Sequence, residues 1–204
     1  AQEEPRIVAV LAQDHTLLNA FAQDKDIYRP ATEALYPYTN DAENDAVFKS
    51  DYEHERFVGK TFFLAWYYGA GAGRLKTLDG SLTSSAIKRG LALMTDAHPA
   101  RDAYLKETKQ QLRKTGVVES HFGRKRWIYK SWSHDPREFQ EALREGANMR
   151  VQATAADILK IALVTIDNSL REHYLESRLV STVHDEVVLE VANDETLRVA
   201  YLVN

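Results

Sequence analysis

The chain has 204 residues, a length that fits one large domain or two small ones. It carries 26 basic and 30 acidic residues, a net charge of −4, and its 44% of apolar residues suffices for a hydrophobic core. The absence of cysteine excludes disulfide frameworks, cysteine-based zinc sites, iron–sulfur clusters and thiol nucleophiles. The longest uncharged run has 13 residues, 61–73, whereas a membrane-spanning helix needs about 20. We therefore expect no membrane partner.

The first half of the chain is predicted to be helical. Apolar residues recur at helical spacing over residues 6–12 and 16–22. A further helix is expected over residues 51–68, with Asp51 as its N-cap and Gly69 just past its end. The glycine-rich run 69–73 follows a helix rather than a strand, so it indicates a break in the chain and not a dinucleotide-binding loop.

The second half is predicted to contain long helices and one hairpin. Residues 81–113 predict two helices that separate near His98 and Pro99, and residues 136–175 predict one long helix or two, with Gly146 as the weak point. Two β-branched runs, 179–183 and 187–191, then flank a polar tripeptide, which is typical of a hairpin.

Charge is distributed unevenly. Residues 41–55 have six acidic residues and one basic, residues 104–130 have eight basic and two acidic, and residues 182–204 have a net charge of −4. Each run alone is typical of a solvated face. In the basic run, however, Phe122, Trp127 and Tyr129 alternate with the sequence Arg-Lys-Arg of residues 124–126. Neighbouring aromatic and cationic groups favour contact with a nucleic acid.

The tripeptide His184, Asp185 and Glu186 lies at the predicted hairpin tip. If strand alternation continues through the tip, His184 and Glu186 share one face and Asp185 points to the other. Two adjacent carboxylates on a rigid turn favour a nearby cation, and Mg²⁺ takes one or two protein carboxylates. A solvated hairpin tip remains the alternative interpretation.

Two stripes of residues recur at intervals of four. Arg56, Lys60, Leu64 and Tyr68 would form one slowly winding stripe roughly 18 Å long. Its cations suit a triphosphate and its far end suits a base, although a buried helix with an extended arginine and lysine is equally consistent. The second stripe consists of Arg144, Asn148 and Gln152, whose amides suit a DNA minor groove; a solvated face is its alternative.

The order of these features resembles the polymerase core of the family A DNA polymerases, the bacterial DNA polymerase I type also found in phages. The segments Gln2-Glu-Glu-Pro-Arg6 and Leu11-Ala-Gln-Asp14 resemble the end of the first polymerase motif and the helix after it. Asp26-Ile-Tyr-Arg29 resembles a segment that touches the nucleotide phosphates, and the stripe from Arg56 to Tyr68 resembles the fingers-helix motif. Residues 116–126 and 152–157 resemble connecting motifs, and the tripeptide 184–186 resembles the third polymerase motif.

The resemblance implies two sets of binding residues. The nucleotide set is Gln2, Glu4, Tyr28, Arg56, Lys60, Leu64 and Tyr68. The DNA set, which would contact the primer–template, is Arg144, Asn148, Gln152 and His184.

The resemblance also implies catalytic roles. Asp185 would bind metal with Glu186 beside it, and Lys60 would assist the leaving pyrophosphate. Glu4 would be a steric gate that rejects the 2′-hydroxyl. The family's second metal-bridging aspartate falls two residues upstream of the position of Ala1, so the chain as written would carry half of a metal site for two divalent ions. The expected ions are Mg²⁺.

The implied fold is α+β and mostly helical, with fingers helices and part of an antiparallel palm sheet that carries the catalytic hairpin. We expect a palm fragment at residues 1–9, fingers at 10–134 and palm at 135–204, without thumb or exonuclease. The expected partners are primer–template DNA and deoxynucleoside triphosphates, and the expected state is a monomer in a bacterial or phage-infected cytoplasm.

Three departures from the family pattern and two alternatives accompany this prediction. Leu64 stands where an aromatic residue is usual, which indicates a phage-like source, and Tyr28 stands where histidine is common. Pro5 lies beside the predicted gate, Glu4. The alternatives are a non-catalytic nucleic-acid-binding module on the same scaffold and a single-subunit phage-type RNA polymerase. Glu4, Glu186 and the run 154–157 favour DNA synthesis.

Overall fold

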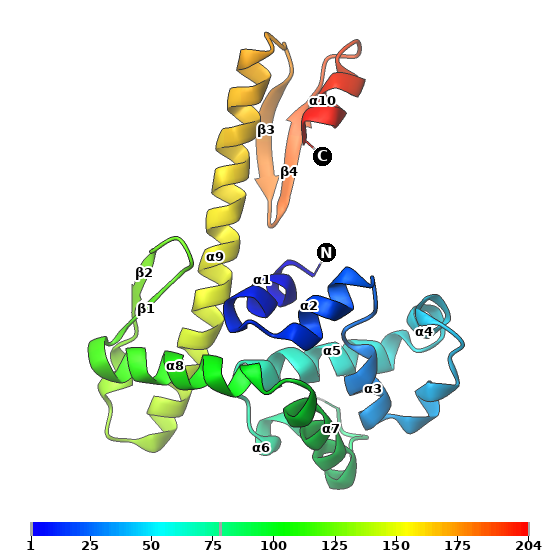
Figure 1. Ribbon diagram of the computed structural model, residues 1–204, viewed down its shortest axis with the longest axis vertical. Helices are drawn as coiled ribbons and strands as arrows, with labels where there is room; N and C mark the ends of the chain where they lie inside the picture. Colours follow the sequence, from blue (N-terminus) through cyan, green and yellow to red (C-terminus); the bar gives the residue numbers. More distant parts are fainter. Residues whose placement is uncertain (1, 78, 204) are drawn as a thin grey trace. The chain divides into compact units, whose positions relative to one another are not determined.

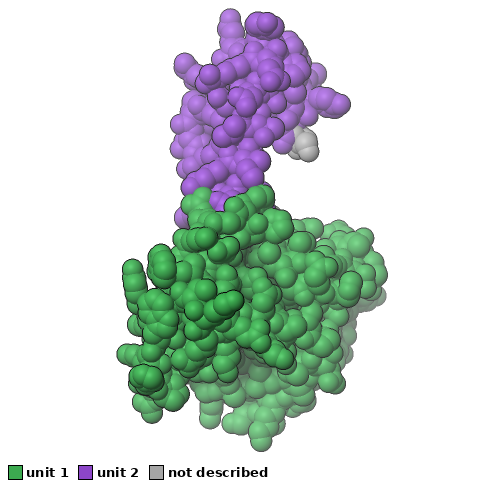
Figure 2. All heavy atoms as spheres, turned by 60° about the vertical axis from the view of Figure 1, so that its left-hand side comes forward, with its two compact units in different colours: residues 1–153 green, residues 154–204 purple. Residues whose placement is uncertain are grey.

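The computed structural model describes residues 2–77 and 79–203 (Figure 1). The chain divides into two compact units, Ala1–Ala153 and Thr154–Asn204, which Figure 2 colours separately. The described elements are mostly helices, together with two antiparallel two-stranded sheets. The predicted α+β, mostly helical fold class is confirmed.

The first unit begins with short helices. Its first elements are α1 (Glu3–Ala12), α2 (His15–Ala22), α3 (Arg29–Leu35), the 3₁₀ helix η1 (Pro37–Asp41), α4 (Asp45–Asp51) and α5 (Glu53–Tyr67). They are followed by α6 (Ala72–Leu75), α7 (Ser84–Ala97), α8 (Ala100–Thr115), β1 (Val117–Glu119), β2 (Lys125–Trp127), the 3₁₀ helix η2 (Tyr129–Trp132) and the start of α9 (Pro136–Glu172). The predicted helices at 6–12 and 16–22 are confirmed, as is the division of residues 81–113 at His98 and Pro99.

Helix α5 supplies much of the core of this unit. It buries Phe62, Phe63, Trp66 and Tyr67, and it packs against α3, α4 and α6. The close approach of α3 requires a glycine, because a Cβ at Gly59 would lie 2.0 Å from the Thr32 hydroxyl oxygen.

Helix α5 ends where the sequence predicted. Gly69 has a φ of +94°, and its N–H donates to the carbonyl of Trp66 while that of Ala70 donates to Ala65. This pair of bonds is a Schellman motif, which glycine favours because it lacks a Cβ. The predicted break after the helix is confirmed.

The prediction of one helix over residues 51–68 is wrong at its start. Asp51 is the last residue of α4, the chain breaks at Tyr52, and α5 begins at Glu53. Asn44 is the N-cap residue, because its side chain accepts hydrogen bonds from Ala46 and Val47 at the start of α4. Tyr52 leaves the helical conformation where its ring packs on neighbouring aromatic rings of η1 and α4.

The prediction of a single hairpin is also wrong, because β1 and β2 form a second one within the basic run. Val117 pairs with Trp127 and Glu119 with Lys125. The intervening loop is closed by the hydroxyl of Ser120, which accepts hydrogen bonds from the N–H groups of Phe122 and Arg124. A short β-branched strand, a five-residue loop containing glycine and a second strand fit the hairpin rule, so the signal was present.

Residues 136–172 form one continuous helix, α9, which decides between the two sequence-based alternatives. Gly146 does not interrupt the helix, because it lies where neighbouring side chains come close. A Cβ there would lie 3.0 Å from Leu112 Cδ1 and 3.2 Å from Val118 Cγ1. Burial of this helix face against α8 and β1 offsets the low helix propensity of glycine.

The second unit holds the rest of α9, β3 (Arg178–Val183), β4 (Glu186–Glu190) and α10 (Thr196–Val203). The two strands pair antiparallel, with Val183 opposite Glu186 and an irregularity between Leu179 and Ser181. The buried residue Glu195 ties the ends of this hairpin together, since its carboxylate accepts hydrogen bonds from Ser177 N–H and Oγ. The predicted hairpin of residues 178–191 is confirmed.

Within the two described stretches of the chain, no helix has both the length and the apolar character needed to cross a membrane.

Candidate nucleotide and primer–template site

Arg56, the first cation of the α5 stripe, is held in place by a buried acid. Its Nε lies 2.6 Å from Oδ2 of Asp26, whose side chain is fully buried. The other oxygen of Asp26 accepts the N–H of Tyr28 at 2.9 Å, and Lys49 Nζ lies 3.9 Å from the carboxylate. The guanidinium carbon also lies 5.4 Å from the centre of the Tyr28 ring. The segment between α2 and α3 therefore fixes where the guanidinium of α5 points.

Tyr28 is a buried phenol whose ring contacts two residues of α5, Arg56 and Phe63. Its ring meets Phe63 edge-on, with the centres 5.8 Å apart. Burial raises the pKa of Tyr28 to about 12; the charge of Arg56 opposes this shift, and those of Asp26 and Glu4 add to it. At neutral pH the hydroxyl is therefore a neutral hydrogen-bond donor.

Tyr68, at the end of the stripe, has a buried hydroxyl that lacks a hydrogen-bond partner among residues 2–77 and 79–203. Burial raises its pKa above the ordinary value, and the negative charge of Glu4 raises it further. Buried polar atoms are nearly always paired in native proteins, so an unpaired one suggests a ligand or water.

Glu4 therefore lies within electrostatic reach of both Tyr28 and Tyr68. Four members of the nucleotide set, from α1, from the start of α3 and from α5, are thus linked by the ring contact of Tyr28 with Arg56 and by electrostatic interactions. Lys60 is exposed one turn beyond Arg56, and Leu64 is half-buried one turn further on. Gln2 is the N-cap residue of α1, in a left-handed conformation with a φ of 84°.

Arg144 connects the DNA set to the end of α5. A Cβ on Gly69 would lie 3.7 Å from Cγ of Arg144, so this side chain lies directly beside the residue that follows Tyr68. The second member of the stripe, Asn148, has a buried side-chain oxygen for which the described part of the chain supplies no partner. Gln152 is exposed. The stripe is therefore partly buried and partly exposed.

In the second unit, the hairpin tip is a two-residue loop made of His184 and Asp185. His184 has a φ of 57°, a conformation that costs a non-glycine residue free energy and is often found at functional sites. Because the loop turns the chain here, strand alternation does not apply, and the predicted division of faces within residues 184–186 is wrong.

Asp185 in the loop and Glu186 at the start of β4 are both exposed. Two adjacent, accessible carboxylates are oxygen donors of the type and number that Mg²⁺ takes from a protein, with water and substrate phosphates completing its shell. In the stretches that the structure describes, no three acidic or histidine side chains cluster closely enough to hold a metal by themselves. The donor set fits a shared ion rather than an all-protein cage.

A cavity of about 320 Å³ lies beside the Asp26 segment and is distinct from the nucleotide set. None of that set lines it. Its lining residues are Thr16, Leu17, Ala20, Lys25, Asp26, Ile27, Arg29, Pro30, Glu33, Asn44, Asp45 and His98.

Sequence reasoning missed a buried polar network next to α5. The carboxylate of Asp14 lies 2.9 Å from His98 Nδ1 and accepts the hydroxyl hydrogen bond of Tyr67 at 3.0 Å. It also caps α2 by accepting the N–H of Leu17. Burial alone would raise the pKa of Asp14, but the hydrogen bond and charge of His98 lower it overall. The only signal in the sequence was an Asp directly before a helix.

Several known proteins are similar in sequence to this chain. The family model described as DNA polymerase family A matches residues 1–204. The chain is 35% identical over 198 residues to DNA polymerase I of Pseudomonas aeruginosa, covering 95% of this chain and 20% of that protein. It is 30% identical over 205 residues to the thermostable DNA polymerase I of Thermus thermophilus, covering 99% of this chain and 23% of that protein.

A solved structure agrees with these matches. The POL domain of Pol1 from M. smegmatis, in complex with DNA primer-template and dNTP, superposes on the whole chain with a TM-score of 0.83 and 26% identity, covering 34% of that chain. The architecture is thus that of a nucleic-acid polymerase segment. The chain belongs to DNA polymerase family A. It spans about a fifth of the length of the curated relatives it matches.

Proposed function

We propose that this chain provides the nucleotide-binding fingers and part of the palm of a template-directed DNA polymerase, which adds deoxynucleotides to a primer 3′-hydroxyl. The observation that carries the proposal is the contact of Tyr28 with Arg56, together with the position of Glu4 within electrostatic reach of both Tyr28 and Tyr68. The solved relative, by its title, binds a primer-template and a dNTP.

Arg56 and Lys60 would hold the triphosphate. They lie one turn apart on α5, so both cations can face the same polyphosphate chain. The contact of Arg56 with Asp26 keeps the guanidinium in place before a nucleotide arrives, which lowers the entropy lost on binding. Lys60, which is exposed, would stabilise the charge that develops on the leaving pyrophosphate.

Glu4 and Tyr68 would select the sugar. The unpaired hydroxyl of Tyr68 can donate a hydrogen bond to an acceptor beside it, and Glu4 supplies a carboxylate within electrostatic reach. A nucleotide with a 2′-hydroxyl would have to displace one of these groups in a crowded, partly desolvated place. Deoxynucleotides are therefore the proposed substrates.

Asp185, with Glu186 beside it, would hold a divalent ion, which we take to be Mg²⁺. When bound, such ions supply charge stabilisation to the attacking and leaving oxygens of the transferred phosphoryl group. Arg144, Asn148, Gln152 and His184 would contact the primer–template. The buried, unpaired oxygen of Asn148 is an acceptor that a DNA group or a bound water can satisfy.

The proposed setting is a monomer in the cytoplasm of a bacterium or of a phage-infected cell. The proposed subdomains are the palm fragment at residues 1–9, the fingers at 10–134 and the palm at 135–204.

Primer extension with matched variants, made in a longer polymerase chain that also supplies the upstream aspartate, tests the proposal. Lys60→Ala should slow extension by roughly 10²–10³-fold, as expected for loss of an electrostatic group acting in the transition state, whereas Lys88→Ala, which removes an exposed lysine of α7, should leave the rate unchanged. Glu4→Ala should raise ribonucleotide incorporation relative to deoxynucleotide incorporation, and Glu3→Ala should not. DNA binding without extension under any condition would favour the non-catalytic module instead.

A further inference from the structure

The β1–β2 hairpin and η2 present a cluster of exposed aromatic side chains that the predicted nucleotide and DNA sets do not include. We call Trp127, Tyr129 and Trp132 the aromatic patch. Their exposed fractions are 56%, 75% and 50%, and the ring centre of Trp132 lies 6.3 Å from that of Trp127 and 6.4 Å from that of Tyr129. Three large rings left in water at such spacing are unusual for a surface without a partner.

The hairpin has an inward and an outward face. Val118 packs near Gly146 of α9, and Arg126, which pairs with Val118 across the strands, reaches Glu145 of the same helix. Because side chains alternate along a strand, Lys125 and Trp127 point to the opposite face. The patch therefore lies on the side of the hairpin that is turned away from α9.

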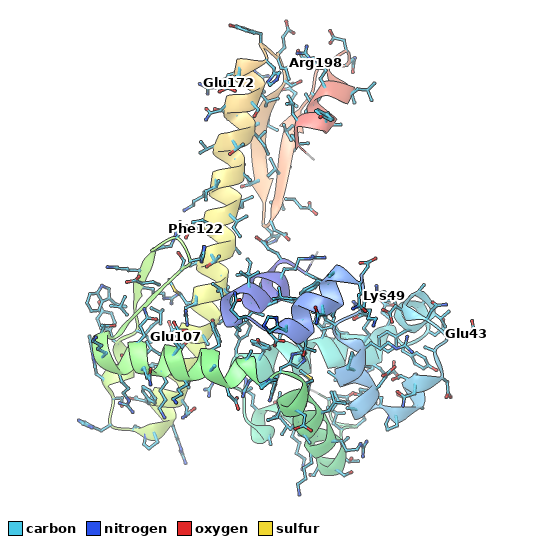
Figure 3. The ribbon with its side chains drawn as sticks, in the orientation of Figure 1. Glu43, Lys49, Glu107, Phe122, Glu172 and Arg198 are labelled. Carbon is cyan, nitrogen blue, oxygen red and sulfur yellow. The ribbon has the colours of Figure 1, made fainter. Side chains whose placement is uncertain are left out.

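The local charge suits a polyanion. Residues 113–132 contain six basic residues and one acidic residue. Lys125 shares the face of Trp127 and is 66% exposed, with Glu119 at 3.5 Å as a surface ion-pair partner, a type of pair that contributes little stability and can exchange for a phosphate. Phe122, labelled in Figure 3, lies in the loop at the tip of the hairpin and adds a further aromatic ring that is 51% exposed.

We propose that the aromatic patch with Lys125 is a binding site for single-stranded DNA, with unpaired bases stacked on the rings and the backbone phosphates near the cation. Successive bases can stack on neighbouring aromatic rings without regard to sequence, and nearby cations neutralise the backbone. A paired duplex offers no exposed base faces, so the patch discriminates against it. This deepens the proposed function and rests on it, because the single strand present during synthesis is the template not yet copied.

Tryptophan fluorescence can report on ligand binding at the aromatic patch. The chain has three tryptophans; Trp127 and Trp132 belong to the patch, and Trp66 is buried on α5. Stacking of a base on the patch should therefore quench most of the exposed tryptophan emission. A titration of the whole chain with oligo(dT), without metal or nucleotide, measures this binding independently of catalysis, so a chain that fails to extend a primer can still pass or fail this test.

We expect saturable quenching by oligo(dT) and much weaker quenching by a blunt duplex of equal length. Tyr129→Ala should weaken oligo(dT) binding by about 5- to 100-fold, the loss expected for one stacking contact. Tyr201→Ala, which removes a tyrosine that is 86% exposed on α10, is the matched control and should not change it. Lys125→Gln should make the binding constant for oligo(dT) less dependent on salt concentration, by the contribution of about one phosphate contact.

Two results would overturn the inference. One is unchanged tryptophan emission with oligo(dT), which is expected if the patch packs against protein rather than nucleic acid. The other is quenching that Tyr129→Ala and Tyr201→Ala leave equally strong, which would place the single strand elsewhere on the chain.

Discussion

The ion pair between Asp26 and Arg56 should couple the stability of the first unit to the position of the predicted triphosphate-binding cation. Asp26 is fully buried and makes two short contacts, with Arg56 Nε at 2.6 Å and the Tyr28 N–H at 2.9 Å. Asp26→Ala removes both, leaving a backbone donor unpaired and the guanidinium without its partner. A charged hydrogen bond contributes about 1.5–3 kcal/mol and a buried unpaired group costs about 1–3 kcal/mol. Since Arg56 is 24% exposed and can regain water, we expect a loss of about 3 kcal/mol.

A double-mutant cycle isolates the pair. Arg56→Ala should cost a similar amount, because it leaves a buried carboxylate whose nearest other cation, Lys49, is 3.9 Å away. The double variant should cost less than the sum, with a coupling free energy of about 1–2 kcal/mol. All three tryptophans lie in residues 1–153, so urea unfolding followed by tryptophan fluorescence reports on this unit.

Additive losses within about 0.3 kcal/mol would refute this reasoning, because distant and independent sites behave in that way. Asp26→Asn is the complementary control. It keeps an oxygen that can accept the Tyr28 N–H and removes only the charge, so it should cost less than Asp26→Ala.

Two further predictions concern the packing and the pH dependence of the same unit. Gly59→Ala should destabilise it by about 1–3 kcal/mol, because the new Cβ would lie 2.0 Å from the Thr32 hydroxyl oxygen. Gly73→Ala, where the described residues leave open space, should be neutral or stabilising by up to about 1 kcal/mol. Equal effects of the two variants on the free energy of urea unfolding would contradict this. The folded-state pKa of Asp14 lies below its ordinary value of 3.8, so its contribution is present above that pH and lost as the pH falls through the lower folded-state value. Acid unfolding of Asp14→Asn should therefore be flatter below about pH 4 than that of the parent, and parallel curves would exclude the contribution of Asp14.

The elements that the sequence predicted well are those with a strong local signal. Helices α1, α2, α7 and α8 have helical apolar spacing. Clear local signals also mark the end of α5 at Gly69 and the boundary between α7 and α8 at His98 and Pro99. The break at Tyr52 could not be predicted in this way, because its ring also packs on Tyr38 of η1, which is close to it only in the fold. Tertiary packing overrode a continuous helical pattern there.

Only part of the candidate site could be predicted from the sequence. Motif order predicted a nucleotide set, and the structure links four of its members, Glu4, Tyr28, Arg56 and Tyr68, by a ring contact and by electrostatic interactions. Spacing alone could not predict that Asp26 binds Arg56, since 30 residues separate them, nor that two oxygens of the predicted sets are buried and unpaired. The hairpin turn was predicted, but the division of faces at its tip was wrong because strand alternation was extended through a two-residue loop.

The most direct test of the central claim is magnesium-dependent primer extension by Asp185→Ala in a longer chain that also supplies the upstream aspartate. The comparison is Asp194→Ala, which removes another exposed carboxylate of the second unit. If the chain belongs to the catalytic centre of a DNA polymerase, the first variant should lose at least about 10²-fold in rate at saturating magnesium. The second should extend at the parent's rate. Equal rates for Asp185→Ala and the parent would contradict the assignment of the hairpin as the metal-binding element.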